Sequence, residues 1–165
     1  MKGEPVRKRA EEKAYRLLAR RAHSERELRT KLEACGFSEA VIRQVIDRCR
    51  ELGYLDDAAY ARQRARDLAV NRLAGDRRIA FDLRERGIPE ELCREAIAEA
   101  RAELGEGEAL DRLLGRRTGE EAAGMEAREK ARWIRRLLGR GFPTGLIYEK
   151  LKGSEEEGFH GDDGE

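Results

Sequence analysis

Residues 79–97 read IAFDLRERGIPEELCREAI, and this stretch gives the clearest prediction of the fold. Ile79 and Leu83 lie four residues apart, so they share one face of a helix. Gly87 then ends that helix, because the residue just past a helix usually needs a positive φ, which glycine adopts without strain. Pro89 follows shortly, and a proline at the start of a helix needs no backbone N–H. The stretch therefore predicts two helices joined by a tight turn.

The same pattern occurs twice more in the chain. Residues 28–46 (LRTKLEACGFSEAVIRQVI) and residues 133–151 (WIRRLLGRGFPTGLIYEKL) place their apolar residues and their turn at the same spacings. The turn glycines Gly36, Gly87 and Gly141 are separated by 51 and then 54 residues. A period of about fifty residues indicates a tandem repeat of one helical unit.

A further helix precedes each pair. The first is predicted from about Arg9 to Ala22, with Tyr15, Leu18 and Ala22 as its apolar stripe. The second is predicted to begin near Asp56, a plausible N-cap, and to end before Gly75. The third begins after the break at residues 105–107 and is short, because several glycines up to Gly124 interrupt it before the helix of Trp133.

Polar residues mark where the paired helices begin. Ser24 followed by Glu27 is a capping box, and Ser38 is an N-cap. No segment shows the period-2 alternation of a strand. We therefore predict an all-α protein of three tandem three-helix repeats, similar to helix-turn-helix units, that form an elongated, curved molecule.

The predicted organisation has five parts. A flexible N-terminus at residues 1–8 precedes repeats at 9–53, 54–104 and 105–153, and a disordered acidic tail occupies 154–165. The tail holds six acidic residues and no Lys or Arg. Without it, 35 basic and 28 acidic residues remain, so the body carries a formal charge of +7. This asymmetry favours an anionic partner, with the tail either competing for the basic surface or only keeping the chain soluble.

Arginines supply the candidate partner-binding surface. They concentrate between Tyr60 and Arg86 and again after Arg132. Arginine recognises carboxylates and phosphates through two parallel hydrogen bonds, although it is also a good residue for exposed helix faces. Two of these arginines are predicted at a helix start, where the helix dipole disfavours cations, which hints at an external anion. The predicted partner-binding residues are Arg62, Arg66, Arg72, Arg77, Arg78, Arg84, Arg135 and Arg136.

The sequence offers little for catalysis, so we predict that the protein is not an enzyme. His23 and His160 are the only histidines, the three cysteines are widely spaced, and no glycine-rich phosphate loop occurs. We expect no metal and no cofactor. The absence of an apolar leader or a long apolar run favours a cytoplasmic protein, and we expect a monomer.

A DNA-reading helix-turn-helix is the main alternative to a packing repeat, because such motifs also have a glycine in the turn. The outward face of the last helix in the middle repeat bears Glu90, Glu91, Glu95 and Glu99. This acidic face opposes approach to a phosphate backbone, so base readout by that helix is not favoured.

Three motifs in order resemble the bacterial RecX family. Residues 24–32 (SERELRTKL) are similar to its opening repeat, and residues 53–61 (GYLDDAAYA) are similar to its junction. Residues 75–88 (GDRRIAFDLRERGI) are similar to its middle block, whereas the third repeat resembles the family only through Leu137, Gly141 and Phe142. The resemblance covers roughly residues 14–100.

The resemblance implies a modulator of RecA, the recombinase that polymerises on single-stranded DNA. Members of the family lie in the groove of the RecA filament and bridge neighbouring protomers. They limit filament growth and thereby lower ATP hydrolysis, strand exchange and LexA cleavage. The resemblance therefore implies a regulator that acts mainly negatively on the RecA filament, with single-stranded DNA as a further partner; the alternative is a repeat protein that binds DNA directly.

Overall fold

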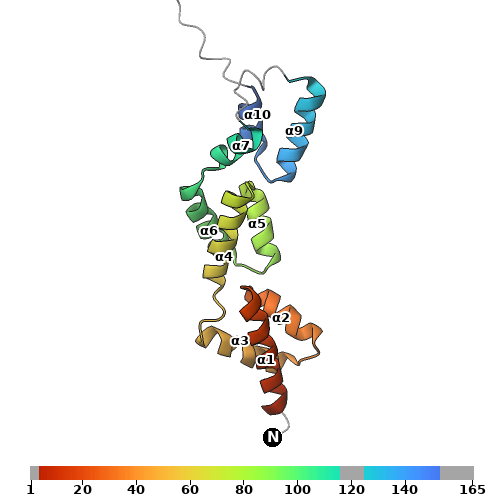
Figure 1. The fold of residues 1–165 in the computed structure, drawn as a ribbon, viewed down its shortest axis with the longest axis vertical. Helices are drawn as coiled ribbons and strands as arrows, with labels where there is room; N and C mark the ends of the chain where they lie inside the picture. Colours follow the sequence, from red (N-terminus) through yellow and green to blue (C-terminus); the bar gives the residue numbers. More distant parts are fainter. Residues whose placement is uncertain (1–3, 116–124, 153–165) are drawn as a thin grey trace, which may run out of the picture. The chain divides into compact units, whose positions relative to one another are not determined.

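The computed structural model of the chain describes residues 4–115 and 125–152. These residues form nine α-helices and one short π-helix, and no strand occurs among them, which confirms the all-α prediction (Figure 1). The predicted tail at 154–165 and most of the predicted loop before the helix of Trp133 lie outside the described residues. The elements are α1 (Glu4–Arg20), α2 (Glu25–Ala34), α3 (Glu39–Glu51), α4 (Asp57–Arg66), η1 (Asp67–Asn71), α5 (Asp76–Glu85), α6 (Glu90–Glu103), α7 (Glu106–Leu114), α9 (Ala127–Gly139) and α10 (Thr144–Lys152).

The helices form three sets of three, as the repeat predicts: α1–α2–α3, α4–α5–α6 and α7–α9–α10. In each set, a glycine with positive φ separates the second helix from the third: 82° at Gly36, 76° at Gly87 and 88° at Gly141. The capping box of Ser24 and the N-cap of Ser38 are both present. The turn chemistry read from the sequence is therefore confirmed.

The first helix departs from the prediction at both ends. It begins at Glu4, so residues 4–8 are helical where a flexible N-terminus was predicted. It ends at Arg20, and Ala22, predicted to belong to its apolar stripe, is exposed beyond the end. The fully buried residues of α1 are Ala10 and Ala14. The predicted stripe consisted mostly of large side chains, whereas the residues of α1 that are fully buried in the first core are small.

The described chain packs as two compact units. The first unit contains residues 4–66 and 80–99, and the second contains residues 67–79, 100–115 and 125–152. The core of the first unit lies among α1, α2 and α3 and includes Leu28, Leu32, Ile46 and Cys49. Cys49 is fully buried and packs in this core as a small apolar side chain.

The second unit has its own core, which lies among α7, α9 and α10. Its largest buried side chain is Phe142, which follows the turn glycine of the third repeat. Phe142 donates its backbone N–H to Leu137 at 3.2 Å, so the chain folds back on the helix it has just left.

Within the first unit, the start of α2 is held by two segments of the next repeat. The backbone N–H of Glu25 donates to Oδ1 of Asp57, in the first turn of α4, at 2.9 Å. The hydroxyl of Ser24 donates to the carbonyl of Arg86, just before the turn of Gly87, at 2.7 Å. The Arg86 guanidinium also donates to Glu27 at 2.9 Å. We name this arrangement a repeat joint. In a repeat joint, the leading helix and the turn of one repeat form hydrogen bonds with the start of the second helix in the preceding repeat.

Candidate interaction surface

The eight predicted arginines divide between the two units. Arg62, Arg66 and Arg84 belong to the first unit, and Arg72, Arg77, Arg78, Arg135 and Arg136 belong to the second. All eight are exposed, as a partner-binding surface requires. They do not form one cluster within either unit, so each group is described by itself.

Two arginines of the first unit point at carboxylates of α6. The Arg62 Nε lies 4.0 Å from Glu99. Arg84 donates two hydrogen bonds to Glu90, at 2.7 Å from Nε and 3.1 Å from Nη2. The bonded Glu90 raises the pKa of Arg84, and Arg84 lowers the pKa of Glu90. Exposed pairs of this kind add little stability, but they lower the charge that these arginines offer to a partner.

In the second unit, the segment that leads into α5 is irregular. After α4, the chain forms the π-helix η1, in which Arg72 donates its backbone N–H to the carbonyl of Asp67, five residues earlier, at 3.1 Å. Leu73 follows with φ of 52°, the only positive φ of a non-glycine residue in the described chain. Such backbone is held by its surroundings, and the Leu73 side chain packs against the second core. The irregular segment leaves Arg72 exposed beside the start of α5, with its guanidinium 3.0 Å from Asp67.

A second repeat joint fixes the start of α5. Gly75 donates its backbone N–H to the carbonyl of Arg140 at 2.8 Å, and Arg140 Nη1 donates to the carbonyl of Arg72 at 2.6 Å. Gly141 is buried against the backbone of Arg78, where a Cβ at position 141 would collide. The joint thus brings Arg72 and Arg78 together with Arg140, which belongs to the second arginine cluster of the sequence but was not among the eight predicted partner-binding residues. We name Arg72, Arg77, Arg78 and Arg140 the junction arginines.

Acidic groups also gather at the start of α5. The backbone N–H of Asp76 donates to Oε1 of Glu106, in the first turn of α7, at 2.8 Å. The Asp76 carboxylate in turn lies 2.6 Å from Arg101, whose Nη2 donates to the carbonyl of Ala74 at 2.6 Å. Burial raises the pKa of Glu106. Carboxylates of the chain therefore lie at the helix start where Arg77 and Arg78 hinted at an external anion, so they offset part of the helix-dipole penalty, and partner binding by these two arginines stays a prediction.

The last two predicted arginines lie on α9. Arg135 and Arg136 are exposed, and the Arg136 guanidinium carbon lies 5.2 Å from the centroid of the Trp133 ring. Glu129, Arg132, Trp133 and Arg136 line a hollow of about 210 Å³. This hollow belongs to the second unit and combines an aromatic ring with three charged side chains.

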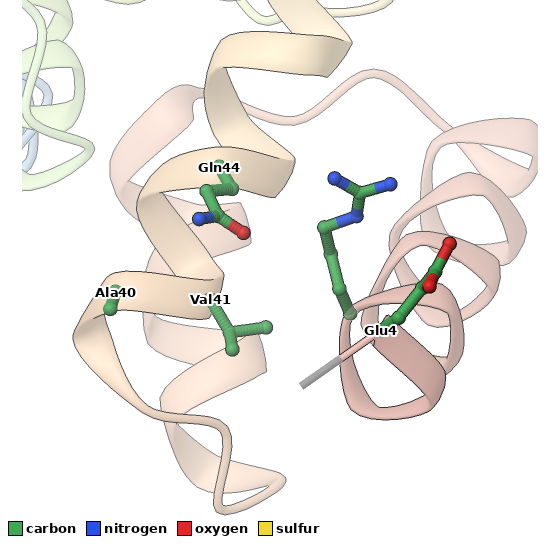
Figure 2. A pocket seen from close by; sticks show the side chains of 5 residues that line it. Glu4, Ala40, Val41 and Gln44 are labelled. Atoms are coloured by element: carbon green, nitrogen blue, oxygen red, sulfur yellow. The ribbon is translucent and has the colours of Figure 1, made fainter. Parts of the chain in front are cut away.

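Another hollow, of about 350 Å³, lies in the first unit between the start of α1 and α3. Figure 2 shows Ala40, Val41 and Gln44 on α3 and Glu4 on α1 around it. Arg7 completes the lining. The lining has no side chain that commonly acts as a nucleophile, and its one carboxylate belongs to the exposed end of α1.

His23 has a structural place. Its side chain is only 4% exposed, and Nδ1 lies 2.9 Å from the carbonyl of Arg21, so Nδ1 carries the proton and donates. Burial lowers the pKa of His23. Among the described residues, no group of His, Cys, Asp and Glu is arranged to hold a metal ion, and no helix is long and apolar enough to cross a membrane. His160 lies outside the described residues.

Comparison with known proteins identifies the family. Residues 10–49 match the model of the first three-helix domain of RecX, and residues 56–97 match that of the second. A regulatory protein RecX of Thermus thermophilus is 42% identical over 145 residues, which cover 88% of this chain and 92% of that protein. The chain belongs to the RecX family. A RecX protein of Syntrophotalea carbinolica is 33% identical over 82% of this chain and 90% of its own length.

Solved structures of RecX proteins share the fold. The crystal structure of RecX from Lactobacillus salivarius superposes with a TM-score of 0.73 over 88% of this chain and 94% of that one, at 18% identity. A second RecX crystal structure gives a TM-score of 0.72 at 23% identity and covers 88% of this chain and 71% of that one. The two matched three-helix domains correspond to the first two helix sets of this RecX chain.

Proposed function

We propose that this RecX chain regulates the RecA recombinase, mainly negatively, by binding in the groove of the RecA filament on single-stranded DNA. It limits filament extension and lowers the ATPase, strand-exchange and coprotease activities of RecA. The observation that carries the proposal is the 42% identity to a regulatory protein RecX over 88% of the chain. The protein acts without a cofactor and as a monomer in the cytoplasm.

The junction arginines support the proposal as the part of the surface that meets the filament. They come from two different repeats, and hydrogen bonds from Gly75 to Arg140 and from Arg140 to Arg72 fix the backbone that carries them, so little loop entropy is lost on binding. Arg77 and Arg78 project from the first turn of α5, next to Arg72. Such a set suits acidic groups of a filament protomer.

Direct DNA reading by a helix-turn-helix is the competing proposal. Its weakness is α6, whose exposed side bears Glu90, Glu91, Glu95 and Glu99. Carboxylates on that side repel phosphates. The RecA proposal is favoured because its partner is a protein. A protein surface can present positive groups to the acidic side of α6 as well as negative groups to the arginines.

The test measures ATP hydrolysis by RecA on single-stranded DNA with substoichiometric amounts of the full chain, together with co-sedimentation with RecA filaments. We expect a lower rate, shorter filaments and a co-sedimenting chain. A chain that ends after Lys152 shows whether the acidic tail competes, and stronger co-sedimentation is expected without the tail. An unchanged rate and unchanged filament length with both chains would overturn the proposal.

A further inference from the structure

Helix α9 carries a line of arginines along one side. Arg128, Arg132 and Arg136 are spaced four residues apart and are all exposed, so their side chains follow one another about 6 Å apart along the axis. We name these three residues the arginine stripe. The helix has five basic residues and one acidic residue, Glu129. The stripe is thus a linear array of positive charge.

An aromatic ring lies beside this stripe. Trp133 is the only tryptophan of the chain and is half-buried, with part of its surface on the second core. The rest of the ring lines the hollow of about 210 Å³ with Glu129, Arg132 and Arg136. The Arg136 guanidinium carbon lies 5.2 Å from the ring centroid. A flat aromatic surface and two guanidinium groups therefore converge on one opening.

The repeat explains why this opening exists. Trp133 stands where the first two repeats have Leu28 and Ile79, and both of those are fully buried. Glu129 stands where they have Ser24 and Gly75, which receive the turn of the following repeat at the two joints. At the equivalent surface of α9, Arg128, Arg132 and Arg136 are exposed among the described residues.

A further repeat would not fit on this surface. At Gly75, even a Cβ would collide with the backbone of Gly141 and Phe142 in the turn that docks there. Glu129 puts a whole side chain at that position, and α9 starts two residues before it, so the helix runs through the point where a joint would form. The opening therefore suits a ligand other than another copy of the repeat.

We propose that the arginine stripe and Trp133 bind a single strand of nucleic acid, with phosphates on the arginines and one base stacked on the ring. Regularly spaced cations fit a polymer whose charge is also regularly spaced, and aromatic side chains stack on bases of any sequence. An acidic protein surface would use the charges but has no need of the part of the ring that lines the hollow, over which the Arg136 guanidinium would give way to a base. The proposal does not rest on the regulation of RecA, because the binding requires no filament.

The test measures the fluorescence anisotropy of a labelled oligothymidylate of about 15 nucleotides with the full chain at several salt concentrations. Replacing the stripe with serine (Arg128→Ser, Arg132→Ser, Arg136→Ser) is expected to weaken binding at least about tenfold. It should also reduce the slope of log K against log salt by about 2, because three phosphate contacts are lost. Trp133→Leu, which restores the residue of the first repeat, is expected to weaken binding by about 5- to 100-fold with the slope unchanged. Trp133→Phe retains a ring and should recover most of the affinity.

A matched control removes three exposed arginines of the first unit: Arg7→Ser, Arg43→Ser and Arg48→Ser. This variant has the same net charge as the stripe variant and should keep both the affinity and the salt slope. Thermal melting by circular dichroism verifies that each variant is folded. Wild-type affinity in the stripe variant or in Trp133→Leu would overturn the proposal. Equal displacement of the oligonucleotide by polyglutamate of the same total charge would instead assign the surface to acidic proteins and also overturn it.

Discussion

Glu106 Oε1 accepts a hydrogen bond from the backbone N–H of Asp76 at 2.8 Å, and so a side chain of the third repeat caps a helix of the second. Asp57 caps α2 in the same manner through the N–H of Glu25 at 2.9 Å. The first N–H groups of a helix have no partner within it, so each carboxylate satisfies a donor that would otherwise be buried without one. Neighbouring repeats are thus held together by hydrogen bonds as well as by apolar packing.

Removal of either cap should destabilise the chain. We expect Glu106→Ala and Asp57→Ala each to lower the free energy of unfolding by about 1 kcal/mol, the usual cost of a lost N-terminal cap. Glu106→Gln keeps an acceptor oxygen and should cost less. Urea denaturation followed by circular dichroism measures the difference, with the exposed Glu95→Ala on α6 as the control for loss of one negative charge. Equal stabilities of Glu106→Ala and Glu95→Ala would contradict the capping role.

Asp82 should make stability depend on acidic pH. Burial raises its pKa, but hydrogen bonds from Arg64 at 2.7 Å and Arg86 at 2.9 Å outweigh burial and hold the pKa below its ordinary value. A lowered pKa contributes stability that is present above the unfolded-state value and is lost as pH falls through the folded-state value. We expect Asp82→Asn to cost about 2 kcal/mol at neutral pH and clearly less near pH ~3.

The measurement is denaturation of Asp82→Asn and the wild type at both pH values. Asp47→Asn, which changes a carboxylate more than half exposed, is the control and should cost little at either pH. If the cost of Asp82→Asn were the same at both pH values, the stabilising effect of the bonds from Arg64 and Arg86 would not depend on the negative charge of Asp82.

The turn glycines should differ in their tolerance of alanine. Gly36 and Gly141 both have positive φ, so each substitution carries the strain of a left-handed backbone, about 1–2 kcal/mol. A Cβ at Gly36 meets nothing within 4 Å, whereas one at Gly141 would collide with the backbone of Arg78. We expect Gly36→Ala to cost about 1 kcal/mol and Gly141→Ala several times more, or to prevent folding. Comparable melting temperatures for the two variants would show that the backbone around Arg78 shifts at little cost to accommodate the added Cβ.

The repeat was legible in the sequence because its turn has strict requirements. A glycine at Gly36, Gly87 and Gly141, with an apolar residue after each, is forced by local backbone geometry and needs no knowledge of distant contacts. The start of α1 was missed because residues 4–9 are all exposed and therefore add nothing to an apolar stripe. The π-helix at residues 67–71 and the positive φ of Leu73 depend on packing against the second core, which no local pattern reveals.

The candidate surface was only partly predictable. Counting arginines found Arg72, Arg77 and Arg78, but Arg140 joins them through a contact across 68 residues. Its position gave one signal, since Arg86 also directly precedes a turn glycine and also reaches back to the repeat before it. The capping carboxylates Asp57 and Glu106 lie 49 residues apart, each at the start of a leading helix. This spacing is close to the repeat period and is a second signal of the joints in the sequence.

The three cysteines should differ in reactivity. Cys35 is exposed, whereas burial raises the pKa of Cys49 to about 11 and also raises that of Cys93. Since the thiolate is the reactive form, we expect one fast-reacting thiol in the native chain at neutral pH and three in denaturant. Titration with a disulfide reagent counts them, and Cys35→Ser should remove the fast reaction. Fast reaction of Cys49 would contradict the packing of the first core.

The arginines of the two units should contribute unequally to regulation of RecA. Arg62 and Arg84 are directed at Glu99 and Glu90, so a partner must displace those carboxylates before it can use them. In the second unit, Arg72 lies 3.0 Å from Asp67, and Arg77 and Arg78 are exposed in the first turn of α5, beside the second joint. We therefore expect Arg72→Ser with Arg77→Ser and Arg78→Ser to lose most of the inhibition of RecA ATPase, by about tenfold or more in the concentration required, since each lost charged contact is worth about 1 kcal/mol or more.

The matched variant is Arg62→Ser with Arg66→Ser and Arg84→Ser, which removes the same charge from the first unit. It should shift the inhibitory concentration much less, because a partner must displace Glu99 and Glu90 before it can use Arg62 and Arg84, which offsets part of what those contacts contribute. Arg78→Ser retains the Cβ atom that lies beside Gly141, and all six substituted residues are exposed, so the melting temperatures of both variants should stay near that of the wild type. A larger loss from the first-unit variant would instead assign the filament-binding surface to α4 and α5 of that unit.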